Sequence, residues 1–288
     1  MSSPSNKTHQ GDVPTTGHSW DGIEELDNPM PRWWLTVFYA CIVWGIIYTI
    51  LFPSWPGVTG AWPGLLGFST RAQVQGEIDR FAEANAAIDA RLAEADLTAI
   101  PNDPELNQYA INAGAAVFRT WCAQCHGSGA AGAVGFPNLL DDDWLWGGDI
   151  TSIHTTIAHG IRNTTDEDAR YSQMPAFGEL LEAPQISALA NYVLSLSGEP
   201  VDPALVPEGA TLFEENCVSC HMEGGVGNYE FGAPNIADAI WLYGGDYDAV
   251  VETITNARFG VMPNWNARLT PAQINAVATY VHGLGGGE

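Results

Sequence analysis

The amino-acid sequence predicts an all-α fold, with one N-terminal transmembrane helix followed by two tandem copies of a small helical domain. Three observations support this prediction. The segment 33–52 is uncharged over twenty positions, the region 105–288 contains one pattern twice, and each copy of the pattern contains a Cys-x-x-Cys-His motif. The chain has 288 residues, which is enough for two compact domains and additional segments.

The apolar segment 33–52, WWLTVFYACIVWGIIYTILF, is the first predicted helix. At ~1.5 Å per residue a helix of this length spans the ~30 Å hydrocarbon layer of a bilayer. A cleaved signal peptide is the alternative, but mostly polar residues precede the segment and no small-residue cleavage site follows it. Lys7 and Arg32 precede the segment and the next basic residue is Arg71, which favours a cytoplasmic location for residues 1–32.

Two further segments flank this helix. The polar residues 1 to about 20 have too little apolar content to form a core, so we expect them to be disordered. Residues 53–104 form a linker between the membrane and the repeat. Within it, 53–67 is rich in Pro, Gly and Trp, and 69–96 has apolar residues at helical spacing, which predicts an amphipathic helix.

The C-terminal part of the chain is an internal repeat, and we predict its boundaries at 105–198 (the first copy) and 199–288 (the second copy). In each copy a Gly-x-x-x-Phe-x-x-x-Cys segment leads into the Cys-x-x-Cys-His motif. A Trp-Leu-x-Gly-Gly-Asp turn and a Met-Pro pair follow, and a helix with apolar residues at i, i+3, i+4 and i+7 ends the copy. The first copy has nine extra residues before its Met-Pro pair, where 163–170 forms a polar insertion.

The Cys-x-x-Cys-His motifs indicate covalently bound c-type haem, because the two thiols can bond the porphyrin vinyl groups and the adjacent histidine can ligate the iron. A structural zinc site is the alternative, but it normally needs two Cys-x-x-Cys pairs around one metal without a histidine after each pair. We therefore expect two covalently bound haem c groups, which in bacteria are attached outside the cytoplasm. The expected attachment residues are Cys122, Cys125, Cys217 and Cys220, and the expected iron-ligating histidines are His126 and His221.

Met174 and Met262 are the expected sixth ligands of the two irons. Each lies in a Met-Pro pair at the same position of its copy, whereas Met222 directly follows His221 and cannot reach the opposite face of the same haem. Ligation by His and Met raises the reduction potential and leaves no open coordination site, which suits electron transfer. The spacing favours ligation within each copy, so that Met174 would serve the haem of His126. An exchanged assignment is the alternative.

Four other side chains are weaker candidates. His154 and His159 could contribute to a bis-histidine site, but a hydrogen-bonded or exposed role is favoured because Met174 is better placed. Arg162 and Arg258 could pair with haem propionates, whose charge is costly to bury alone. An ordinary surface role is nearly as good an explanation for both arginines.

The net charge of −24 makes nucleic acid an unlikely partner. An acidic face suits docking of a basic protein, because opposite potentials accelerate and orient the encounter. Candidate acidic patches lie at 141–143 and 166–168. A generally soluble, acidic surface is the alternative explanation.

Each copy of the repeat resembles a small class I cytochrome c domain. The resemblance implies that the terminal helices of each copy cross where a glycine meets an aromatic ring, pairing Gly114 with Tyr192 and Gly209 with Tyr280. It also implies that a proline carbonyl accepts the ring N–H of each iron-ligating histidine. The prolines at the matching positions are Pro137 and Pro234.

Beyond this, the chain resembles the dihaem subunit (subunit III, CcoP/FixP family) of cbb3-type cytochrome c oxidases. The resemblance extends from about residue 17 to the end of the chain, with one membrane helix as in the shorter members of the family. The segments that carry it are 21–34 (DGIEELDNPMPRWW), 118–126 (FRTWCAQCH), 141–148 (DDDWLWGG) and 171–177 (YSQMPAF).

The oxidase resemblance implies a role in respiratory electron transport. The chain would accept electrons from a donor cytochrome c, basic or membrane-tethered, and relay them through two haems. The electrons would pass to the monohaem subunit II and then to the haem-copper centre of subunit I, where oxygen is reduced and protons are pumped. The chain itself would contribute no catalytic residue and would not be an enzyme on its own.

The same resemblance implies a single-pass protein of the bacterial inner membrane, with its haem domains in the periplasm. Two other functions are compatible with parts of the sequence. One is a free-standing, membrane-tethered dihaem electron shuttle. The other is a dihaem peroxidase, which needs an open iron site and is disfavoured by two methionines at matching positions.

Overall fold

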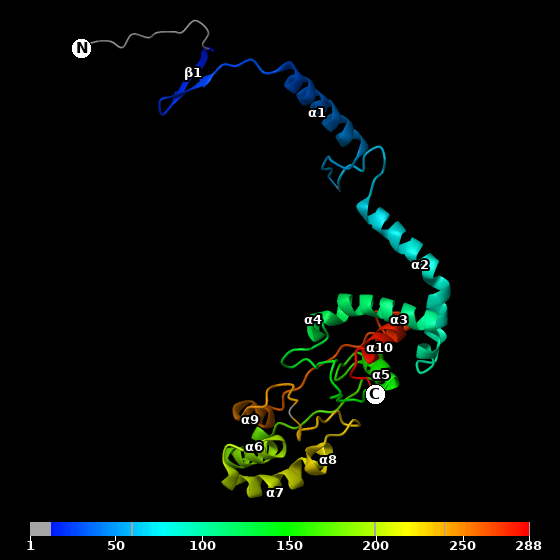
Figure 1. The fold of residues 1–288 in the computed structure, drawn as a ribbon, viewed down its shortest axis with the longest axis vertical. Coiled ribbons are helices and arrows are strands. Elements are labelled where there is room, and N and C mark those ends of the chain that lie inside the picture. Colours follow the sequence, from blue (N-terminus) through cyan, green and yellow to red (C-terminus); the bar gives the residue numbers. More distant parts are fainter. Residues whose placement is uncertain (1–12, 59, 199, 239, 288) are drawn as a thin grey trace, which may run out of the picture. The chain divides into compact units, whose positions relative to one another are not determined.

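The computed structural model describes residues 13–58, 60–198, 200–238 and 240–287 (Figure 1). The chain divides into two compact units, and the boundary between them falls between Glu83 and Ala84 in the sequence. The described residues are mostly helical, as the sequence predicts, and the second unit contains both copies of the repeat.

A β-hairpin precedes the membrane helix. Strands β1 (Thr15–Trp20) and β2 (Ile23–Leu26) pair antiparallel, with Trp20 opposite Ile23. The two-residue turn between them, Asp21-Gly22, has φ values of 52° and 85°, and Asp-Gly is a favoured sequence for such a turn. The expectation of disorder to about residue 20 is therefore wrong for residues 13–20, and residues 1–12 lie outside the described residues.

Helix α1 (Arg32–Leu51) corresponds to the predicted membrane segment. Among the described residues it is the one helix long and apolar enough to cross a membrane, with a mean hydropathy of 1.9. It ends where Pro53 forces the preceding Phe52 into an extended conformation (φ −112°, ψ 160°). The amides of Leu65 and Leu66 donate to the carbonyls of Ile50 and Leu51, which pairs groups that a helix end leaves free.

Helix α2 (Thr70–Glu94) confirms the helix expected at 69–96. The apolar side chains of its first half, including Val74, Ile78 and Phe81, are exposed. In the second unit, Leu92 is fully buried, and the buried Asn275 donates to its carbonyl oxygen at 2.8 Å. The C-terminal part of α2 is thereby fixed to the last helix of the chain.

The helices of the first copy are α3 (Pro104–Val117), α4 (Ala123–His126), α5 (Ile150–His159) and α6 (Ala183–Ser197). Those of the second copy are α7 (Val206–Asn216), α8 (Val218–His221), α9 (Tyr247–Asn256) and α10 (Pro271–His282). Short 3-10 helices also occur, namely η1 (Ile100–Asn102), η3 (Phe177–Glu179), η4 (Pro203–Leu205) and η5 (Glu223–Gly225). The element η2 (Phe118–Cys122) is a π-helical turn between α3 and α4.

Local sequence signals explain where these helices begin. The Gly-Gly-Asp turns end in Asp149 and Asp246, whose carboxylates accept backbone N–H groups in the first turns of α5 and α9. Helices α6 and α10 each begin with a capping box and a proline in the first turn. Equivalent elements of the two copies therefore form for the same reasons.

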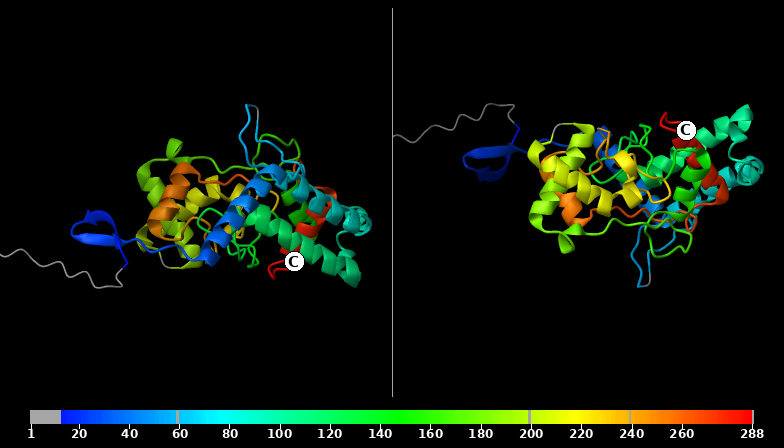
Figure 2. Two further views of the ribbon diagram at one scale, coloured as in Figure 1. Left: turned by 90° about the horizontal axis from the view of Figure 1, so that it is seen from above. Right: turned by 90° about the horizontal axis from the view of Figure 1, so that it is seen from below.

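The terminal helices, however, are exchanged between the copies. Helix α3 packs against α10, and α6 packs against α7. In Figures 1 and 2 the C-terminal helix, drawn in red, accordingly lies with the green helices of the first copy. A Cβ atom on Gly114 would lie 2.7 Å from Cβ of Tyr280, and one on Gly209 would lie 2.7 Å from Cβ of Tyr192. The predicted pairs of Gly114 with Tyr192 and of Gly209 with Tyr280 are therefore wrong.

The exchange gives each hydrophobic core side chains from both copies. In one core Phe118 and Ile157 pack with Val277 and Val281, and in the other Leu189 and Val193 pack with Phe213. The short connection 198–205 between α6 and α7 favours this arrangement, because helices joined by a few residues usually pack as neighbours.

Candidate haem sites

Each Cys-x-x-Cys-His motif lies on a short helical turn. Helix α3 continues through η2 into α4, so Cys122, Cys125 and His126 lie at i, i+3 and i+4 and share one side of the turn. Gly127 ends the turn with a φ of 79°. In the second copy α8 carries the motif in the same way, and Met222 adopts the equivalent left-handed conformation with a φ of 62°.

A proline carbonyl orients each motif histidine, at the positions expected from the sequence. Nδ1 of His126 donates to the carbonyl oxygen of Pro137 at 3.1 Å, and Nδ1 of His221 donates to that of Pro234 at 3.0 Å. Burial lowers the pKa of both histidines, so both rings are neutral at neutral pH. Each ring thus presents an unprotonated Nε2, the form that ligates iron.

The two motifs open into two cavities. The first cavity, of about 100 Å³, contains Cys122 and His126 in its wall, and the second, of about 410 Å³, contains Cys217, Cys220 and His221. Apolar side chains cover most of both walls. In the first cavity these include Phe118, Ile153, Ile157, Val277 and Val281, and in the second they include Phe177, Leu189, Val193, Phe213, Val250 and Ile254.

The methionines lie in the opposite cavities from those that the spacing favours. Met262, from the second copy, lines the first cavity with His126, and Met174, from the first copy, lines the second cavity with His221. The prediction that each methionine shares a site with the histidine of its own copy is therefore wrong. Two backbone hydrogen bonds of 3.0 Å between Met262 and Ile161 hold the second copy's Met-Pro segment against the first copy.

The two cavities adjoin. Pro137, Asn138, Asp143 and Leu145 line both of them, so one layer of side chains forms a common wall. Three of these residues belong to the segment 137–143, which also supplies the carbonyl that orients His126. Groups bound in the two cavities would therefore be separated by this short segment of the first copy.

Asp143 is the ionisable residue in this common wall. Burial, together with the smaller effects of the nearby carboxylates of Asp238, Asp141 and Asp142, raises its pKa to about 6. The spacing of the sequence did not single out Asp143 as more than a part of an acidic surface patch. Its position between the two cavities is a consequence of the exchange of the terminal helices between the copies.

Asp143 is expected to destabilise the folded protein above pH 6. Its pKa is higher in the folded state than in the unfolded state, so the cost of ionisation is present above about pH 6 and disappears as the pH falls towards 4. A shift of about two units corresponds to about 3 kcal/mol, and partial exposure reduces this to about 1–2 kcal/mol. Asp143→Asn should raise the free energy of unfolding by that amount at pH 8 and leave it unchanged at pH 4.

Thermal unfolding of the full chain in detergent at both pH values measures this effect. Asp142→Asn is the matched control, because Asp142 is an exposed neighbour in the same acidic run. An Asp143→Asn protein that gains no stability at pH 8, or gains the same at both pH values, would contradict the assigned role of the carboxylate.

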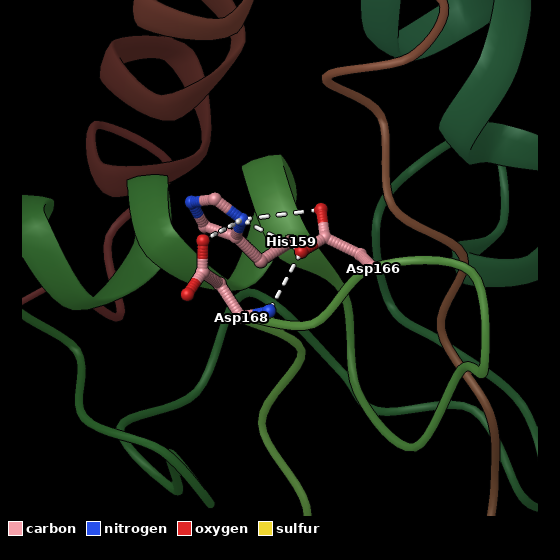
Figure 3. Close-up of side chains that lie close together, drawn as sticks. All are labelled: His159, Asp166 and Asp168. Carbon is pink, nitrogen blue, oxygen red and sulfur yellow. Dashed lines mark hydrogen bonds and ion pairs between the residues drawn. The ribbon is translucent and has the colours of Figure 1, made fainter.

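The histidines considered as alternative iron ligands lie elsewhere. The residues that line the two cavities do not include His154 or His159. Nδ1 of His159 lies 3.2 Å from the carboxylate of Asp166 and 3.9 Å from that of Asp168 (Figure 3). Nδ2 of Asn266 donates to the same Asp166 carboxylate at 2.6 Å. This cluster holds the polar insertion of the first copy against the second copy.

The residues of both cavities fit a c-type haem. Burial raises the pKa of Cys122 and Cys217 to about 11, so these sulfurs are neutral thiols in apolar surroundings and stand where thioether sulfurs would be in the mature protein. Each cavity combines motif cysteine side chains (Cys122 in the first, Cys217 and Cys220 in the second), a neutral histidine oriented by a carbonyl, a methionine and apolar walls. This donor set and these walls are those of a His/Met-ligated haem.

A helix suited to a membrane and repeated Cys-x-x-Cys-His cavities define a membrane-anchored c-type cytochrome. The model of the family "Cytochrome C oxidase, cbb3-type, subunit III" matches residues 110–193 and 204–281, and that of the "N-terminal domain of cytochrome oxidase-cbb3, FixP" matches residues 12–59. The chain belongs to the CcoP/FixP family of cbb3-type cytochrome c oxidase subunits.

The sequences of several CcoP and FixP subunits match essentially the whole chain. The CcoP subunit of Cereibacter sphaeroides is 67% identical over 290 residues, with 100% of both chains covered. The CcoP subunit of Rhodobacter capsulatus is 56% identical, with 98% of both chains covered, and the FixP subunit of Sinorhizobium medicae is 51% identical, with 96% of both covered. The chain is thus a subunit of a cytochrome c oxidase complex, and the chain itself contains the cytochrome c domains.

Proposed function

We propose that this chain is the dihaem electron-accepting subunit of a cbb3-type oxidase. It takes electrons from a donor cytochrome c and passes them to the monohaem subunit and then to the haem-copper subunit, which reduces oxygen and pumps protons. The observation that carries the proposal is the common wall of the two cavities, because adjoining haem sites permit rapid electron exchange within one chain.

Each haem, when bound, supplies one-electron chemistry at its iron. Cys122 and Cys125 would attach one group, and Cys217 and Cys220 the other. His126 with Met262, and His221 with Met174, would hold the two irons, and a donor set of this kind leaves no open site for oxygen or peroxide. The protein side chains contribute no catalytic acid, base or nucleophile of their own. Their role is to fix the separation of the two sites and to set their potentials.

The membrane helix and the charge of the chain support the remaining parts of the proposal. Helix α1 anchors the chain in the bacterial inner membrane, with the segment before it in the cytoplasm and both haem sites in the periplasm, where haem c is attached. The acidic surface, part of a net charge of −24, attracts a basic or membrane-tethered donor cytochrome.

Purification in mild detergent tests this function against that of a free-standing electron shuttle. An oxidase subunit should co-purify with two other polypeptides, haem b and copper, whereas a shuttle should emerge alone. Pyridine haemochrome analysis of the isolated chain should give two haem c equivalents. Fewer than two equivalents, or a chain that never associates with copper, would overturn the proposal.

A further inference from the structure

Arg162 belongs to the first copy but lines the cavity of the second motif. Its Nε donates to the carbonyl of Gly260 and its Nη1 to that of Ser172, both at 2.8 Å. Its guanidinium also lies over the ring of Phe259, 5.8 Å from the centroid, and its backbone has a φ of 53°. The side chain is therefore fixed in the wall of the cavity.

This guanidinium has no carboxylate to balance its charge. Among the ion pairs of the described residues, none involves Arg162 or Arg258. Burial lowers the pKa of Arg162, which is the effect of removing a cation from water without providing an anion. The lack of a partner is notable in a chain where acidic residues outnumber basic ones by 34 to 10. Half-buried cations normally have a counter-ion.

Arg258 and Tyr243 line the same cavity. The guanidinium of Arg258 lies 4.9 Å from the ring centroid of Tyr243, and it donates to Oγ1 of Thr253 and to the carbonyl of Ala249. Burial raises the pKa of Tyr243, and the charges of Arg162 and Arg258 act in the opposite direction. A guanidinium has five N–H groups, so these carbonyl and hydroxyl partners leave donors on both arginines.

We propose that Arg162, Arg258 and Tyr243 form a carboxylate-binding site for the propionates of the haem attached at Cys217 and Cys220. The first copy thus supplies a cation to the haem of the second copy, in addition to the methionine of that site. The inference rests on the proposed function, because a covalently bound haem provides the carboxylates. Arginine suits this role because its planar donors match a carboxylate.

The proposal predicts a change in the potential of one haem. A cation beside the propionates favours the reduced iron, because it offsets their negative charge. Arg162→Gln in the full chain should shift the one-electron reduction equilibrium of the second-cavity haem by about tenfold towards the oxidised form, which is about 59 mV. Arg162→Lys should retain most of the wild-type potential. The haem in question is identified as the one whose potential moves in Met174→His.

Spectroelectrochemical titration measures both midpoints in one sample, so the first-cavity haem is an internal reference. Resonance Raman spectroscopy follows the propionate bending band, which should shift in Arg162→Gln. Arg119→Gln is the matched control, since it removes one positive charge from an exposed position. If Arg162→Gln does not assemble, Tyr243→Phe should still shift the same propionate band, because it removes the hydroxyl and retains the ring.

Two outcomes would overturn the proposal. An unchanged potential and propionate band in Arg162→Gln would mean that Arg162 only ties together the segments at Ser172 and Gly260. Equal shifts of both midpoints would indicate a general loosening of the protein. A haem content below two equivalents in the wild-type chain would instead refute the proposed function, independently of any result with Arg162.

Discussion

Met262→His is expected to lower the midpoint potential of the haem attached at Cys122 and Cys125, although Met262 lies in the other copy of the repeat. Met262 lines the cavity of His126, so the substitution converts that iron from His/Met to bis-His ligation. Axial ligands set haem potentials over a range of ~0.8 V, and we expect a decrease on the order of 0.1–0.2 V. The potential of the second haem should change little.

A background that retains one haem assigns the affected iron. In a chain with Cys217→Ala and Cys220→Ala, the remaining haem is the one at Cys122 and Cys125. Met262→His should still lower its potential in this background, and Met174→His, the matched control, should leave it unchanged. Ligation within each copy would give the reverse pattern and would refute the exchanged arrangement.

If the one-haem background does not assemble, NMR of the reduced full-length protein provides the same assignment. The ε-methyl group of an axial methionine gives a strongly upfield resonance. The resonance lost in Met262→His should show contacts with the first cavity, where Phe118 and Val277 lie. Contacts with Leu189 or Phe213, which line the second cavity, would contradict the exchange.

The sequence was sufficient to predict the membrane helix, the helix that precedes the repeat and the terminal helices of each copy, but not the N-terminal β-hairpin. The uncharged segment, the paired motifs and the capping signals are local features, and local features determine where helices begin and end. The contacts of His126 and His221 with proline carbonyls were implied by the resemblance to class I cytochrome c domains, and each proline lies 11 or 13 residues after its histidine. Each of these features lies within a few dozen residues of its partner.

The exchange of helices could not be deduced from the repeat, because the two copies are equivalent in pattern. Tyr192 and Tyr280 occupy the same position of their copies, so either could face Gly114. One signal was available, the short connection 198–205, which favours packing of α6 on α7 and leaves α10 for α3. The roles of Asp143 and Arg162 depend on that exchange, since both residues act at the boundary of the two copies.

Cutting the chain between the two copies is expected to leave both fragments bound to each other. The connection 198–205 is the place to insert a protease site, because it joins α6 to α7 and lies outside both motifs. After cleavage of the folded protein, independent domains would separate, and the described residues of the fragment beginning near residue 199 include no helix suited to a membrane. It would then appear in the supernatant when membranes are pelleted.

The exchanged fold predicts the opposite result. Helix α10 packs in the core of the first motif with Phe118, and α6 packs in the core of the second motif with Phe213, so each core requires both fragments. We expect the cut fragments to remain together in the membrane pellet with both haems low-spin, and to separate only in denaturant.

A chain ending at Ser197 should fail more severely than the cut protein. It would lose Met262 and all of α10, exposing the apolar face of α3 and leaving the first iron without its sixth ligand. We expect little folded product, with a high-spin spectrum for any haem attached, and recovery when residues 198–288 are co-expressed as a separate exported chain. A stable, low-spin product from the truncated chain alone would show that the first copy folds independently, and the exchanged cores would then be wrong.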